Sequence, residues 1–152
     1  MILGTKARYA VMAMVDMAGR PKDVPVSLAE LAQSQEITVP YLEQIFSKLR
    51  HGGLVQSVRG PGGGYILGKS AGEICIASIV EAVEESTQMT RCDKHTEGCM
   101  SSKARCLTHD LWDGLEQQIN NYLNSITLAD VRDRKVKGLN VQSSPPVTVT
   151  HH

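Results

Sequence analysis

Long apolar runs are missing from this chain of 152 residues, and aromatic residues are scarce. No uninterrupted apolar stretch approaches the roughly 18 residues that a membrane-spanning helix needs, so we expect no membrane partner. The segment AVMAMV at 10–15 is too short for the core of a signal peptide and ends at Asp16, so we expect a cytoplasmic protein. One Phe, one Trp and four Tyr leave a core that must be mainly aliphatic, which favours helices.

Net charge is also absent, because 16 Lys and Arg balance 16 Asp and Glu. The balance is uneven along the chain. Residues 1–69 hold eight basic and five acidic side chains, whereas residues 70–152 hold eight basic and eleven acidic ones. A basic first half is a weak indication of a polyanionic partner, since an ordinary solvated surface explains the same charges.

Helical signals dominate the first part of the sequence. Apolar spacing and terminal Gly residues predict helices over 5–19 and 39–51, and a capping box predicts a short helix over 28–33. The third helix carries Pro40 in its first turn, where proline is tolerated. The residues expected to cap these helices are Thr5, Ser27, which begins a capping box with Glu30, and Thr38.

The pattern changes after Gly53. Residues 54–58 and 65–67 read as two short strands joined by the turn RGPGGG at 59–64, which predicts a β-hairpin. Three helices followed by a two-stranded hairpin is the element order of a winged helix-turn-helix, a DNA-binding fold.

The second half predicts an extended segment and a helix over 74–85, then a longer helix over 108–124 and a short one from Thr127. Cys75 lies between two isoleucines, and we expect it in the core. The fold class is therefore mainly α with a small β-hairpin. The expected division is a winged helix-turn-helix at 1–69, a cysteine segment and long helix at 70–133, and a disordered tail at 134–152 that ends in His151 and His152, which we assign to no site.

The third helix has a face suited to DNA. Leu42, Ile45, Phe46 and Leu49 form its apolar face, which leaves polar side chains on the other. Gln can pair with adenine and Glu can accept from the cytosine amino group, whereas phosphate contacts position a protein without reading sequence. We assign base contacts to Gln44 and Glu43, and phosphate contacts to Tyr41, Lys48 and Arg50.

The hairpin turn begins with Arg59 and Gly60, and an arginine at such a tip could enter a minor groove. A plain surface hairpin is the alternative. The turn lacks the Lys-Ser/Thr ending of a phosphate-binding loop. Glu43 taken alone is equally well an exposed helix former near Lys48. The order of helices and hairpin favours groove contact.

Three of the four cysteines lie in the polar segment RCDKHTEGCMSSKARCLTH at 91–109, with no CxxC pair. Their spacing of seven does not indicate a coiled coil, because polar residues fill the slots between them. Free cysteines usually lie in a core, so exposed ones indicate metal binding. The donors would be Cys92, Cys99, Cys106 and His109. These donor types suit zinc as well as an iron–sulfur cluster, and a metal-free thiol redox sensor is a further alternative.

Three segments carry a family resemblance: TKARYAVMAMVDMA, ITVPYLEQIFSKLRHGGLVQSVRGPGGGYIL and RCLTHDLWDGLEQQINNYLNSITL. They closely resemble the IscR family of iron–sulfur cluster regulators, which are bacterial winged-helix transcription factors, over residues 1–133. The resemblance implies that Glu43, Gln44 and Arg59 face promoter DNA. It also implies a 2Fe–2S cluster whose occupancy selects which promoters the protein binds. Through these promoters the protein would repress or activate cluster-assembly genes. Its ligands would be Cys92, Cys99, Cys106 and His109.

The resemblance further implies a homodimer in which the helices at 108–124 of two chains pack together. The apolar residues of this helix that we assign to dimerisation are Leu111, Leu115, Ile119 and Tyr122. Two departures stand out: both gaps between the cysteines are one residue longer than in the family pattern, and Pro40 replaces a small hydroxyl residue. No acid–base pair stands apart from the proposed ligands, so we do not expect an enzyme. An iron–sulfur electron carrier is less favoured, because it would need no recognition helix.

Overall fold

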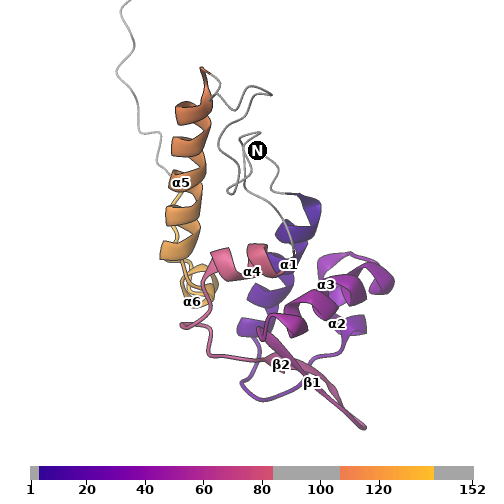
Figure 1. Cartoon of the computed structure of the whole chain (residues 1–152). Helices are drawn as coiled ribbons and strands as arrows, with labels where there is room; N and C mark the ends of the chain where they lie inside the picture. Colours follow the sequence, from indigo (N-terminus) through magenta and orange to yellow (C-terminus); the bar gives the residue numbers. More distant parts are fainter. Residues whose placement is uncertain (1–3, 84–106, 139–152) are drawn as a thin grey trace, which may run out of the picture.

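The structure, a computed structural model, describes residues 4–83 and 107–138 (Figure 1). Within these residues it is mainly helical with one antiparallel hairpin, which confirms the predicted winged-helix class. None of the described helices is both long and apolar enough to cross a membrane. The elements in chain order are α1 Thr5–Ala18, α2 Leu28–Gln35, α3 Val39–His51, β1 Val55–Val58, β2 Gly64–Leu67, α4 Ile76–Ala82, α5 His109–Ser125 and α6 Leu128–Arg132.

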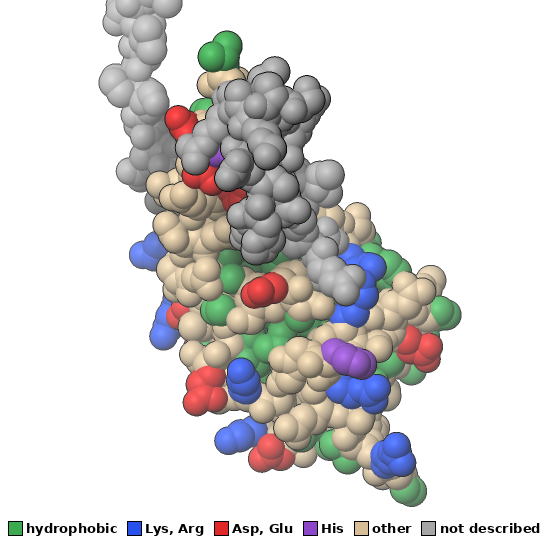
Figure 2. Space-filling model, in the orientation of Figure 1, with side chains coloured by type: hydrophobic (Ala, Val, Ile, Leu, Met, Phe, Trp, Pro, Cys, Tyr) green, Lys and Arg blue, Asp and Glu red, His purple; other side chains and the backbone are tan. Residues whose placement is uncertain are grey.

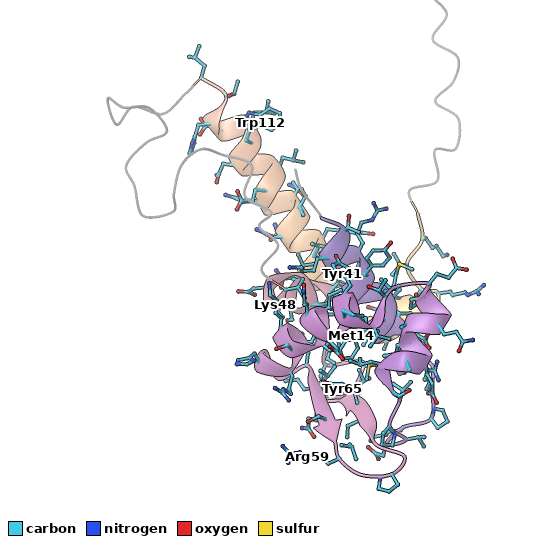
Figure 3. All side chains as sticks on the ribbon, turned by 90° about the vertical axis from the view of Figure 1, so that its right-hand side faces the viewer. Met14, Tyr41, Lys48, Arg59, Tyr65 and Trp112 are labelled. Atoms are coloured by element: carbon cyan, nitrogen blue, oxygen red, sulfur yellow. The ribbon has the colours of Figure 1, made fainter. Side chains whose placement is uncertain are left out.

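Helix α1 is the centre of the core and packs against α2, α3, α4 and α6. Its buried face is made largely of alanines, with Met14 fully buried among them, so that neighbouring helices approach closely. Figure 3 shows Met14 in the middle of the packed helices. Ile79 of α4 and Leu128 of α6 are also fully buried in this core. The core therefore draws on residues from both sides of the predicted boundary at 69 and 70.

Two predicted helix limits were wrong by one or two residues. Helix α1 is preceded by Gly4, so Thr5 is its first residue rather than its cap. Helix α2 continues to Gln35 because its end is set by Glu36, whose φ of 55° turns the chain into the left-handed region. The N–H of Ile37 then bonds to the carbonyl of Ala32 at 3.0 Å.

Cys75 is half-exposed, so the prediction that it lies in the core was wrong. The cause is that the chain is extended around Cys75, so that successive side chains point to opposite sides. The N–H of Ile76 bonds to the carbonyl of Ile126, and the N–H of Leu128 bonds to the carbonyl of Ile74. The side chains of Ile74 and Ile76, on either side of Cys75, are both buried. In an extended segment the residue between two inward side chains points the other way. The Cys75 thiol lies 3.0 Å from the Ser78 hydroxyl, and this hydrogen bond lowers the pKa of the thiol.

Asp16 joins α1 to α2. Its carboxylate accepts hydrogen bonds from Arg20 Nε at 2.8 Å, from Gln35 Nε2 at 2.9 Å and from the Ser34 hydroxyl. Burial raises the pKa of Asp16, but the bonds from Ser34, Arg20 and Gln35, together with the charge of Arg20, outweigh burial and lower the pKa below its ordinary value. The carboxylate is therefore held ionised at the junction of the two helices.

Replacing Asp16 with Asn is expected to lower the free energy of unfolding by about 2 kcal/mol at pH 7, because hydrogen bonds to a charged group are lost. A carboxyl whose folded pKa is depressed stabilises the fold above its unfolded pKa, and this contribution is lost as pH falls through the folded value. Urea melts at pH 7 and pH 3 should therefore show the difference shrinking in acid. Glu30→Gln, which alters only the exposed partner of Arg20 at 3.5 Å, is the control and should change little. A difference that is equal at both pH values contradicts the prediction.

Candidate nucleic-acid interface and cysteine segment

Helices α2 and α3 form a tight helix–turn–helix unit. The Ser27 hydroxyl accepts a hydrogen bond from the N–H of Glu30 at 3.1 Å and so caps α2, as predicted. The second bond of the predicted capping box does not form, because the Glu30 carboxylate lies 3.5 Å from the Arg20 guanidinium instead. Thr38 precedes α3, but its side chain makes no capping bond. The predicted apolar face of α3 is confirmed, since all four of its members are fully buried: Leu42, Ile45, Phe46 and Leu49.

The outer face of α3 carries the side chains that we assigned to DNA. Glu43, Gln44 and Arg50 are exposed, and Lys48 is half-buried. Tyr41 is also half-buried, because its ring packs edge-on against that of Tyr9 with centroids 5.9 Å apart. The tyrosine therefore helps to hold α3 against α1. The last turn of α3 carries Lys48, Arg50 and His51, and cationic side chains there interact favourably with the negative end of the helix dipole.

The hairpin is fixed to α3 at its base. Strands β1 and β2 pair from Val55 with Leu67 to Val58 with Gly64, so β1 begins one residue later than predicted and β2 one residue earlier. Val26 and Tyr65 exchange two backbone hydrogen bonds of 3.0 and 2.8 Å. The Tyr65 ring also packs on Phe46 of α3, with centroids 5.0 Å apart. The orientation of the hairpin relative to α3 is therefore set by packing.

Glycine is required beside this junction. A Cβ added at Gly64 would lie 2.2 Å from the carbonyl oxygen of Val26, which no side chain can tolerate. At the other end of the hairpin, Gly60 adopts a φ of 104°, which a side chain would resist. Arg59 is exposed, and Figure 3 places it at the free end of the hairpin. A narrow, glycine-rich tip beside an arginine can approach another molecule closely.

Basic side chains are dispersed over this side of the molecule rather than gathered in one patch (Figure 2). The arrangement matches the modest excess of positive charge in the first half of the sequence. Binding of a polyanion would then depend on a few well-placed cations, of which Arg50 and Arg59 are exposed.

Helix α5 projects away from the packed helices, with α6 at its base (Figure 1). Its C-terminal end joins the core through Leu123 and through Ile126, the residue that follows the helix. Higher along the helix, Leu111 is 61% exposed, Leu115 39% and Tyr122 54%. Trp112 is 37% exposed and Ile119 is half-buried. The apolar side chains recur at helical spacing, so α5 carries an apolar face that the described part of the chain leaves uncovered.

The cysteine segment lies mainly outside the described residues, as do Cys92, Cys99 and Cys106. His109 is the first residue of α5 and is half-exposed. Over 4–83 and 107–138, no three or more His, Cys, Asp or Glu residues are grouped as a metal site. Thiolates together with one accessible imidazole at the start of a helix are suitable in chemical type for a metal or an iron–sulfur cluster.

Comparisons with known proteins agree with this architecture. The model of the Rrf2 family, described as an iron-dependent transcriptional regulator, matches residues 3–134. The chain is 52% identical over 131 residues to the HTH-type transcriptional regulators IscR of Yersinia pseudotuberculosis serotype O:1b (strain IP 31758) and Serratia proteamaculans (strain 568). The matched residues make up 86% of this chain and 79% of each relative.

Solved structures show the same fold. The structure of T. potens IscR has a TM-score of 0.71 and 34% identity, and the match covers 94% of both chains. CymR, the global cysteine regulator of B. subtilis, has a TM-score of 0.72 and 30% identity, over 88% of this chain and 98% of its own. Both similarities extend well beyond the helix–turn–helix unit and the hairpin.

Proposed function

This chain belongs to the Rrf2 family of transcriptional regulators, and we propose that it is a DNA-binding homodimer that senses iron–sulfur cluster status through a 2Fe–2S cluster. Regulators of this kind are not enzymes. In this proposal the protein acts in the cytoplasm on promoters of cluster-assembly genes, which it represses or activates according to cluster occupancy.

The observation that carries the proposal is the fixed pairing of an exposed helix face with a hairpin. Gln44 and Glu43 are exposed on α3, and Arg59 is exposed at the hairpin tip. The Phe46–Tyr65 contact holds the two elements together. A helix of this kind can enter the major groove while the hairpin reaches the adjacent minor groove. In this proposal Gln44 and Glu43 read bases, and Tyr41, Lys48, Arg50, Arg59 and Gly60 contact the backbone or the minor groove.

The uncovered face of α5 supports the homodimer. Apolar side chains at Leu111, Leu115 and Tyr122 would leave water if two α5 helices packed together. Ile119 would extend the same contact. A two-fold dimer would present two recognition helices to two half-sites of a palindromic promoter, which raises affinity over that of a single domain.

The cluster would be held by Cys92, Cys99 and Cys106 with His109. When bound, a 2Fe–2S cluster would supply a redox-active centre whose presence depends on iron and sulfide supply. His109 presents its imidazole from the first turn of α5, the helix assigned to dimerisation. Thiolate and neutral imidazole ligands would tie the cysteine segment to this helix, so occupancy would bias how two chains place their recognition helices.

The test is to compare promoter preference with and without the cluster. Randomised duplexes are selected by the anaerobic, cluster-loaded protein and by the cluster-free protein, then sequenced. Different preferred sequences for the two forms are expected. Identical preference in both forms contradicts cluster sensing, and the absence of any sequence preference contradicts the regulator itself.

Substitutions at the interface sharpen the same test. Gln44→Ala is expected to relax preference at one base pair by about tenfold while leaving non-specific affinity unchanged, because it removes a base contact. Arg59→Ala is expected to weaken all duplexes by about tenfold and to reduce the salt dependence. Lys135→Ala, in the segment after α6, is the charge-matched control for Arg59. Fluorescence anisotropy over a salt series measures these effects. A Gln44 variant that weakens every sequence equally contradicts the assigned role.

A further inference from the structure

A pocket of about 440 Å³ lies on the side of the hairpin formed by β2. It is bounded by the end of α1, the loop at 20–26, strand β2, the segment that follows it and α6, which meet in the lower part of Figure 1. Its size is typical of pockets that hold small molecules. The apolar residues of its lining include Met17, Ala18, Val26 and Ala71, all of them buried.

Basic side chains dominate the polar part of the lining. Arg20, Lys22, Lys69 and Arg132 line the pocket, against the single acidic residue Asp23. The two arginines already have partners. Arg20 bonds to Asp16 at 2.8 Å, and Arg132 bonds to Asp133 at 2.9 Å.

The two lysines differ from the arginines. Lys22 and Lys69 are exposed, and neither forms an ion pair within the described part of the chain. They come from different segments, one from the loop after α1 and the other from the segment after β2. The pocket therefore combines an apolar floor with two available ammonium groups. A ligand that complements both would have an apolar body and a negatively charged group.

We propose that this pocket binds a small organic anion, a carboxylate or a phosphate ester, as a second signal for the regulator. The anionic group would lie between Lys22 and Lys69, and the apolar body would cover Met17, Val26 and Ala71. None of the residues that line this pocket is a proposed cluster ligand.

The pocket wall connects directly to the recognition helix. Val26 and Tyr65 both line the pocket and are joined by two backbone hydrogen bonds. The ring of Tyr65 packs on Phe46, which is fully buried on the inner face of α3. A ligand that contacts Tyr65 is thus one side chain away from α3. Its binding would favour one placement of the hairpin relative to α3 and so alter DNA affinity.

The binding test uses nuclear magnetic resonance of the full-length, ¹⁵N-labelled protein. The probes are hexanoate and phenyl phosphate, with hexanamide as the neutral counterpart of hexanoate. At least one anion is expected to shift the backbone amides of Val24, Leu67 and Lys69 with a dissociation constant at or below the millimolar range. Hexanoate alone indicates a carboxylate ligand, and phenyl phosphate alone a phosphate ester. No response to either anion, or an equal response to hexanamide, overturns the proposal.

A double substitution tests the lysines. Lys22→Gln with Lys69→Gln is expected to weaken anion binding about tenfold, because each exposed charge pair contributes modestly. Both side chains are exposed, so the melting temperature should not change. Lys6→Gln, at the other end of α1, is the control and should bind as the parent does. Unchanged anion affinity in the double variant overturns the proposal. Weakened DNA binding with unaltered anion binding overturns it too, since the lysines would then serve the DNA backbone.

The DNA readout separates this proposal from the proposed function. An anion that binds the pocket is expected to change the affinity for the selected promoter at least twofold in the parent and not in the lysine double variant. Anion binding without any promoter binding would contradict the proposed function alone. Promoter binding that ignores a bound anion would overturn the pocket's role as a signal site.

Discussion

Replacing Leu111 and Leu115 together with Asp is expected to convert the protein from a dimer into a monomer and to lower its affinity for a palindromic promoter about 100-fold or more. Each leucine side chain gives about 1.5–3 kcal/mol when it leaves water, and a two-fold interface uses each of them twice. Leu111 and Leu115 are 61% and 39% exposed in the single chain, so this burial is still available to a partner. Two aspartates in the same place would put four negative charges into the contact.

The fold of the single chain should survive this double substitution. Leu123, near the C-terminal end of α5, and Ile126, just after it, pack against the core, and the substitution leaves both intact. Far-UV circular dichroism should therefore be unchanged, while sedimentation equilibrium should show half the mass. Gln117→Glu is the matched control, because at 100° per residue Gln117 lies on the opposite side of α5. A variant that sediments as the parent does would show that this face is not the dimer interface.

The sequence predicted the elements where their signals are local. Ser27 and Glu30 predicted the start of α2, and Thr127 predicted the start of α6, where it forms a capping box with Asp130. The apolar spacing of α3 predicted its buried face without error. These signals involve residues three or four apart, so they can be recognised before the chain is folded.

Features that join distant segments were not predicted. The pairing of Val26 with Tyr65 and the contact of Tyr65 with Phe46 fix the hairpin, yet no local pattern connects these residues. The half-exposed state of Cys75 likewise follows from its pairing with Thr127, far along the chain. The pocket beside β2 combines Lys22 and Lys69, which in sequence look like isolated surface charges. For α5 the sequence showed the helical spacing of apolar residues. Only the packed structure shows whether other elements cover this apolar face.

Loss of one cluster ligand is the second large effect that we expect. After anaerobic reconstitution, the parent protein should hold about two iron and two sulfide ions per chain and absorb visible light. Cys106→Ala should reduce iron, sulfide and absorbance to about a tenth, because one iron would lose a protein ligand. Cys75→Ala is the control for a lost thiol, since Cys75 lies outside the proposed set and bonds to Ser78. A colourless parent protein with one zinc ion per chain contradicts the cluster.

His109 allows the ligand role to be separated from any role in folding. It is the half-exposed first residue of α5, so His109→Ala should lose the cluster while the cluster-free protein still folds. His109→Cys should keep the cluster, because a thiolate replaces the imidazole as a donor. Imidazole ligation raises the reduction potential of a 2Fe–2S centre, so the Cys variant should have a lower potential than the parent. A cluster with an unchanged potential in this variant would mean that another residue supplies the fourth ligand.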